Sequence, residues 1–209
     1  MSDFTYLLLD YRLIAVIAAP LVAIVILLVE RQMLKVYLLG IQYLMVAWLA
    51  LAALPPGSAL AKLVAGWIAV FILNFGAVRA GSRSTTESSA VGFPRGRVFR
   101  IAAVLLVVIG TIGVSFDRWI PIESIRSETQ QAAMLVGAMG LLGIGLYSSP
   151  LYVGISLITV VSGFEIIYSA VEPSLAVIAL LALVHLGIAL VISYFEIIWA
   201  ENQSEAAVQ

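Results

Sequence analysis

Long apolar segments, each bounded by a short polar turn, constrain this chain more than any other feature of its sequence. About 20 consecutive apolar residues cross the hydrocarbon core of a bilayer as a helix. Seven segments come close to that length, at residues 13–29, 36–54, 59–78, 98–115, 131–147, 151–169 and 175–195. The sequence therefore predicts an all-α, polytopic bundle of about seven transmembrane helices, forming a single domain over residues 1–209.

The composition supports this class and excludes several others. Hydrophobic residues make up 63% of the chain and charged residues 11%, whereas soluble domains carry about 25% charged residues. The balance of 11 Lys and Arg against 12 Asp and Glu argues against a nucleic-acid partner, which needs a basic face. The absence of cysteine and the single histidine exclude thiolate metal sites and a haem held by two histidines of this chain. We therefore expect no cofactor, no metal and no soluble small-molecule substrate.

The connections between the segments are mostly short. Only residues 79–97 and 116–128 form longer ones, and the second holds Trp119, Ile122 and Ile125, which we expect to lie along the membrane interface. None of these pieces is large enough to fold as a domain of its own. Any chemistry is therefore expected inside the bilayer or on a partner subunit.

The distribution of Lys and Arg predicts an orientation. One set of connections holds seven of them, Arg31, Lys35, Arg79, Arg83, Arg95, Arg97 and Arg100, and the other set holds four, Arg12, Lys62, Arg118 and Arg126. The sequence thus predicts a multi-pass protein of the cell (inner) membrane, with its N-terminus outside and its C-terminus in the cytoplasm. Lys62, close to a predicted helix start, is expected to extend its ammonium group to the lipid headgroups.

Glu165 is the clearest ionisable residue in the predicted membrane interior. A charge at such a depth costs about 3 kcal/mol on insertion scales, which makes it a functional candidate. Ser162, Glu165, Ser169 and Glu172 are spaced by three, four and three residues, which places them within about 80° of one helix face. We interpret this polar stripe as a proton path to Glu165. The alternative is a helix end whose carboxylate is reached by headgroup water.

His185 lies near the middle of the last apolar segment. It shares a helix face with Ala182, Ala189 and Ser193, and small residues mark faces at which membrane helices approach closely. We therefore expect His185 to point into the bundle, where an imidazole can accept and donate protons near neutral pH. A hydrogen-bonded histidine with a structural role is the alternative.

Other polar and small residues in the segments indicate helix packing. Gln42 and Asn74 are neutral amides, which we expect to hold helices together rather than to carry out chemistry. The fifth segment is predicted to be a close-packing helix because of its glycines, Gly137, Gly140, Gly143 and Gly145.

Two stretches of the sequence resemble the K subunit of bacterial complex I. Residues 31–42 resemble the start of its second helix, where a basic pair precedes an apolar run and Gly-Leu-Glu. Gly163-Phe164-Glu165 resembles the same Gly-Leu-Glu segment, and residues 186–190 resemble the end of the third helix. Because Gly40 and Gly163 lie 123 residues apart, the pattern occurs twice. It predicts related, parallel repeats of three helices over residues 10–80 and 130–200, with a linker over residues 80–97.

Length and number of segments also resemble the E component of the membrane-bound, energy-converting hydrogenases, a relative of the K subunit. In this superfamily an intramembrane Glu belongs to a chain of carboxylates, lysines and histidines that couples redox chemistry to proton or sodium pumping. The resemblance places Glu165 at the first family Glu, and Gln42, which does not titrate, at the same position of the first half. The second family Glu would fall near Leu183, two positions before His185.

The resemblance implies a membrane subunit of a redox-driven complex that translocates protons or cations, either complex I-like or hydrogenase-like. Glu165 would exchange protons, which His185 or water would pass on, and the partners would be the lipid bilayer and antiporter-like membrane subunits. We do not expect the chain to be catalytic by itself. Two alternatives are a structural or assembly subunit, and a stand-alone small transporter with its site in a cavity between helices.

Overall fold

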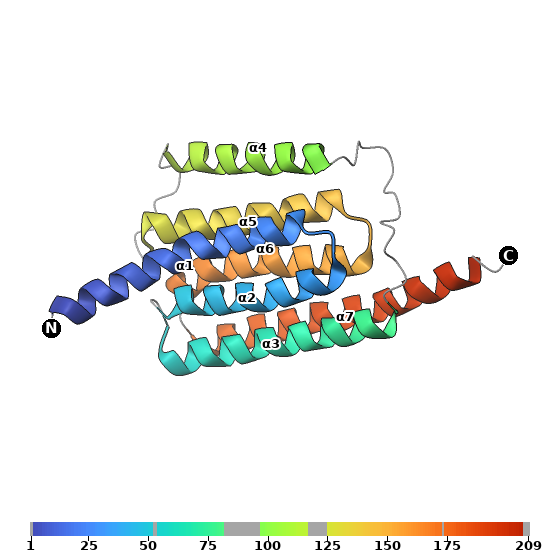
Figure 1. Ribbon diagram of the computed structural model, residues 1–209. Coiled ribbons are helices and arrows are strands. Elements are labelled where there is room, and N and C mark those ends of the chain that lie inside the picture. The colour runs from blue at the N-terminus through green and yellow to red at the C-terminus, as the bar shows by residue number, and fades with distance from the viewer. Residues whose placement is uncertain (1, 52–53, 82–96, 117–124, 173, 207–209) are drawn as a thin grey trace.

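The chain folds into seven helices, as the apolar segments predict (Figure 1). The computed structural model describes residues 2–51, 54–81, 97–116, 125–172 and 174–206. The helices are α1 (Ser2–Leu28), α2 (Gln32–Ala50), α3 (Pro56–Arg79), α4 (Arg97–Phe116), α5 (Ser127–Leu146), α6 (Pro150–Val171) and α7 (Leu175–Ala206). Every regular element in these ranges is a helix, so the all-α polytopic fold is confirmed.

The apolar segments coincide with the helices to within a few residues, except at the two ends of the chain. There, α1 begins at Ser2 and α7 continues to Ala206, because a helix needs no apolar residues where it leaves the membrane. Pro56 and Pro150 occupy first helical positions of α3 and α6, where the missing backbone N–H has no partner to lose. The predicted linker core at 82–96 and the interfacial Trp119 and Ile122 lie outside the described residues.

Successive helices run antiparallel, and each of the first three helices packs on the helix four places later in the chain (Figure 1). Helix α1 lies on α5, α2 on α6 and α3 on α7, while α4 lies at the margin of the bundle against α5. The short turns on either side of α2 and α6 keep α1–α3 and α5–α7 together as two groups of three. This is the arrangement that parallel repeats would give, and the repeat itself remains a prediction.

Helix α6 is the central helix, and it approaches α5 closely at glycines. A Cβ atom added to Gly140 would lie 2.6 Å from the backbone nitrogen of Val160, and one added to Gly163 would lie 2.5 Å from that of Gly137. Gly143 faces the Ser156 side chain, whereas an added Cβ at Gly145 would meet nothing within 4 Å. The close-packing face of α5 therefore consists of Gly137, Gly140 and Gly143.

Large apolar side chains cover the outer surface of the bundle. Phe71, Leu106 and Leu183 are 71%, 73% and 65% exposed, respectively. Six helices are long and apolar enough to cross a membrane, and α1 adds an apolar run over Leu13–Leu28. A soluble monomer rarely exposes apolar surface so extensively. The chain is therefore a multi-pass membrane protein with its lipid-facing side chains on the outside.

Candidate functional site

Glu165 lies within the protein, about 9 Å from the end of α6 at 1.5 Å per residue. Its side chain is buried, at 2% exposure. The position of Glu165 near a helix end left open that headgroup water reaches its carboxylate. Burial of the side chain excludes such direct contact. A carboxylate in such a place needs a charged or hydrogen-bonding neighbour, because an isolated buried charge is strongly disfavoured.

Lys62 is that neighbour, and our expectation that it extends to the headgroups is wrong. Its side chain is buried, at 4% exposure, and its Nζ lies 3.3 Å from Oε1 of Glu165. Helix α3 runs inward from the end at which α6 finishes, and Lys62 lies six residues after Pro56, again about 9 Å deep. The two charges therefore meet at one depth, and pairing inside the protein replaces contact with headgroups.

His185 approaches Glu165 from the third side, as its predicted inward orientation requires. It is buried, and its Nε2 lies 3.9 Å from Oε2 of Glu165. Its Nδ1 lies 2.9 Å from the carbonyl oxygen of Leu181. Because a carbonyl only accepts, Nδ1 holds a hydrogen, and in the neutral ring Nε2 is free to accept a proton. Leu183, where the family resemblance places a second Glu, faces outward instead.

Helix α2 completes the site with an aromatic ring. The edge of the Tyr43 ring packs on His185, with centroids 5.4 Å apart and planes at 66°. The Tyr43 hydroxyl and both amide atoms of the adjacent Gln42 are buried without a hydrogen-bond partner in the described part of the chain. Asn74 on α3 is only half-buried, and its Oδ1 is likewise without a partner there. Interhelical hydrogen bonds from these two amides therefore stay a prediction.

The structure buries part of the polar stripe on α6 and leaves its outer end at the surface. Ser162 and Ser169 are buried beside Glu165, and Glu172, at the predicted turn, is exposed at the C-cap of the helix. In the other direction, Thr159 and Ser156 are also buried, but they turn away from this face around the helix, so that Ser156 faces Gly143 of α5. Their hydroxyls escaped notice because single Ser and Thr residues are common in membrane helices, and only the central position of α6 makes them part of the interior.

A second group of polar residues lies at the opposite end of the bundle. Lys35, which the sequence places in a connection, is only 1% exposed. Glu196 is buried on α7 and accepts hydrogen bonds from Gln32 Nε2 at 3.1 Å and from the backbone N–H of Leu151 at 3.0 Å. The second bond satisfies a first-turn N–H of α6, which has no partner within its own helix.

The spacing of residues in the sequence contains a signal that could have identified Lys62 as a residue of the site. Glu165 and Gln42 differ by 123 in residue number, and so do His185 and Lys62. The offset that relates the two Gly-containing patterns thus also pairs the basic residues of α3 and α7. In the structure α3 and α7 pack on each other, which brings Lys62 and His185 to the same carboxylate.

No protein-family model matches this chain, and neither the curated proteins nor the solved structures contain a match to it.

Glu165 can exchange a proton with either basic neighbour. Oε1 faces an ammonium group and Oε2 faces the proton-accepting nitrogen of an imidazole. A proton that leaves Lys62 for the carboxylate yields a neutral amine and a carboxylic acid, and that acid can in turn protonate Nε2 of His185. The step to His185 needs a shift of about 1 Å to reach hydrogen-bond distance, whereas Lys62 at 3.3 Å is already close to it. The arrangement suits proton transfer between three helices.

Proposed function

We propose that this chain is a proton-translocating membrane subunit of a larger, redox-driven complex of the complex I or energy-converting hydrogenase type. The observation that supports it is the buried group of Lys62, Glu165 and His185, three titratable side chains from three helices around one carboxylate. Ionisable residues inside membrane proteins are costly and most often mark ion paths or proton relays. The resemblance of Gly163-Phe164-Glu165 to the K-subunit segment leads to the same class.

Replacing Glu165 with glutamine tests this function. Glutamine keeps the size of the side chain but cannot exchange a proton, so we expect redox-driven proton translocation to fall by about tenfold or more. The measurement is the quench of an acridine dye in inverted membrane vesicles of the native host, energised with NADH or with hydrogen. An immunoblot of the same vesicles checks that the amount of the chain is unchanged.

The matched control is Glu172→Gln, since Glu172 is exposed at the end of the same helix. Water can replace an exposed carboxylate, and we expect this variant to pump like the wild type. Wild-type translocation by the Glu165→Gln variant would remove Glu165 from the mechanism and would favour the structural or assembly role.

His185→Ala is expected to have a smaller effect, about two- to fivefold on the same dye quench, because water can occupy the space of the ring and pass protons on. The amount of assembled chain should stay constant. A loss of the chain from the membrane, without a specific defect in translocation, would show instead that His185 is a structural residue.

The complex itself is testable by purification from native membranes in mild detergent. We expect antiporter-like and redox subunits to co-purify with the chain. A stable monomer or homodimer that transports protons in liposomes by itself would contradict the subunit assignment and favour the stand-alone transporter.

A further inference from the structure

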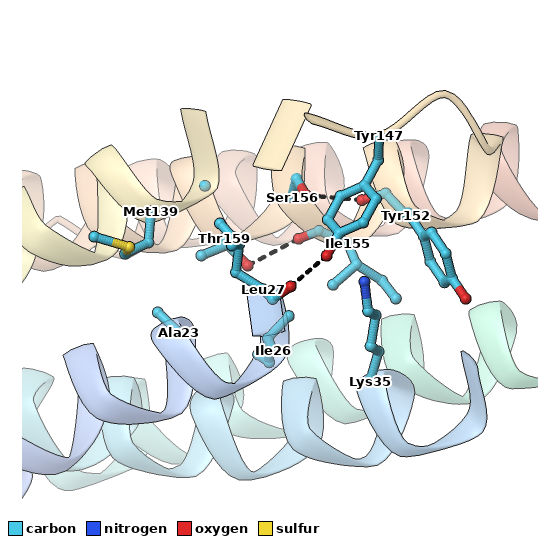
Figure 2. A pocket seen from close by; sticks show the side chains of 11 residues that line it. Ala23, Ile26, Leu27, Lys35, Met139, Tyr147, Tyr152, Ile155, Ser156 and Thr159 are labelled. Atoms are coloured by element: carbon cyan, nitrogen blue, oxygen red, sulfur yellow. Dashed lines mark hydrogen bonds between the residues drawn. The ribbon is translucent and has the colours of Figure 1, made fainter. Parts of the chain in front are cut away.

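Lys35 lies in a cavity at the end of the bundle opposite to Lys62 and Glu165. Its Nζ is 3.6 Å from the ring centroid of Tyr147 and 3.9 Å from that of Tyr152. Figure 2 shows Lys35 extending from α2 toward both rings. The cavity is about the size of one water molecule, and polar side chains form part of its lining. An ammonium group over two aromatic faces is stabilised by their electron density.

The two tyrosines also hold this end of the bundle together. The Tyr147 hydroxyl donates to the carbonyl of Leu27 at the end of α1, and the Tyr152 hydroxyl donates to the carbonyl of Glu30 at 3.0 Å. Both bonds tie the connection between α5 and α6 to the connection between α1 and α2. Lys35 itself belongs to α2 and lies next to these two hydrogen-bonded tyrosines.

A row of hydroxyl groups winds around α6 from this cavity to Glu165, and it turns about 180° on the way, from the face that meets α5 to the face that meets α3 and α7. Ser156 and Thr159 line the cavity, and Ser162 follows at the same spacing of three residues, with Glu165 next. Side chains three apart are neighbours on a helix, and nine residues from Ser156 to Glu165 span about 13.5 Å. Each hydroxyl donates to the carbonyl four residues back, at 2.8, 2.8 and 2.9 Å, so its oxygen remains available to accept from water.

We propose that the Lys35 cavity is a water-filled chamber and that Lys35 is a second proton-exchanging group, connected to Glu165 by water along Ser156, Thr159 and Ser162. In one passage, the Lys35 ammonium releases a proton to chamber water and becomes a neutral amine. Water carries the proton along the hydroxyl row to the Glu165 carboxylate, which becomes a carboxylic acid. No covalent bond to carbon changes and no electron moves. The proton-exchanging role rests on the proposed function, whereas the hydration of the chamber does not.

Single cysteines test the hydration, because the chain contains none. Ser156→Cys places a thiol in the chamber. Ser193→Cys is a close control, since Ser193 is equally buried, donates to a backbone carbonyl and faces a glycine, as Ser156 does, but does not line the cavity. Thiols react as thiolates, which need water around them.

The experiment uses Ag⁺ as a small, water-soluble thiol probe on membranes that contain the full chain. The rate is read from the loss of later maleimide labelling in SDS. We expect Ag⁺ to block Ser156→Cys about tenfold faster or more than Ser193→Cys. Equal or slower blocking would overturn the hydrated chamber. Thr159→Cys, at the next cavity position, gives the same test if Ser156→Cys does not accumulate.

Lys35→Arg tests the proton-exchanging role. Arginine keeps the positive charge and the contact with the rings, but it does not release a proton in proteins. We expect both Lys35→Arg and Lys35→Met to lower redox-driven dye quench by about tenfold, with Ser156→Cys still blocked rapidly in each background. Near wild-type translocation by Lys35→Arg would overturn the proton-exchanging role of Lys35. The second variant is Thr159→Val, which removes one hydroxyl of the row.

The outcomes separate this inference from the proposed function. Wild-type translocation by Glu165→Gln together with rapid Ag⁺ blocking of Ser156→Cys would leave a hydrated chamber in a protein that does not pump through Glu165. Slow Ag⁺ blocking of Ser156→Cys together with defective translocation by Glu165→Gln would support the proposed function and would contradict the water-filled chamber.

Discussion

Lys62→Met is expected to lower the free energy of unfolding by about 3–5 kcal/mol, because it removes the partner of a buried charge. The Lys62 and Glu165 side chains are only 5% and 3% exposed, and their charged atoms are 3.3 Å apart. Methionine fills nearly the same space, so the effect reports the lost charge rather than a cavity. The measurement is unfolding of the purified chain by SDS in mixed micelles, followed by circular dichroism.

A double-mutant cycle provides the control. Lys62→Met combined with Glu165→Gln removes both charges, and we expect it to regain most of the stability that Lys62→Met alone loses. Such recovery gives a coupling free energy between two residues that are in contact. Additive losses in the double variant would mean that the two charges do not pair, and the site as described would be incorrect.

Gly163→Ala is expected to destabilise the bundle by about 3 kcal/mol, at the upper end of the range for overpacking. The added Cβ would lie 2.5 Å from the backbone nitrogen of Gly137 and 2.8 Å from the carbonyl oxygen of Ala133. Backbone atoms cannot move aside as a flexible side chain does, so α6 must shift away from α5. Because Glu165 is two residues further on, we also expect weaker pairing with Lys62. Thermal unfolding in detergent measures the first effect.

Gly137→Ala is the matched control on the facing helix. An added Cβ at Gly137 would meet nothing within 4 Å, although its backbone contacts α6 at Gly163. Alanine also favours the helix by up to about 1 kcal/mol relative to glycine. We expect the Gly137→Ala variant to be as stable as the wild type or slightly more so. Equal destabilisation by both substitutions would contradict the close contact between α5 and α6.

The position of the site at the contact between the two halves has a mechanical consequence. Lys62 belongs to α3 and His185 to α7, while Glu165 on α6 contacts both. Movement of α1–α3 relative to α5–α7 changes the distance from Lys62 to Glu165 but not that from His185 to Glu165, because His185 and Glu165 belong to the same group of three helices.

The sequence by itself determined which segments cross the membrane. The thickness of the bilayer sets a minimum apolar length, and this requirement is local, so hydropathy alone located all seven helices. It also determined that Glu165 and His185 are costly residues placed at membrane depth, and that Ala189 and Ser193 share the inward face with His185. Burial of these residues in the structure agrees with that pattern.

Only the tertiary structure decided which charges meet. Near a helix end, Lys62 could reach the headgroups or a partner with equal ease, and the choice depended on the packing of α3 against α6 and α7. Lys35 and Glu196 likewise resemble residues of polar turns until their neighbours are known. Charge pairing and hydrogen bonding act between atoms a few ångströms apart, and in this bundle those atoms belong to residues far apart in the chain, such as Lys62 and Glu165, or Gln32 and Glu196 at 164 positions. Such proximity is a property of the folded bundle, and no local pattern encodes it.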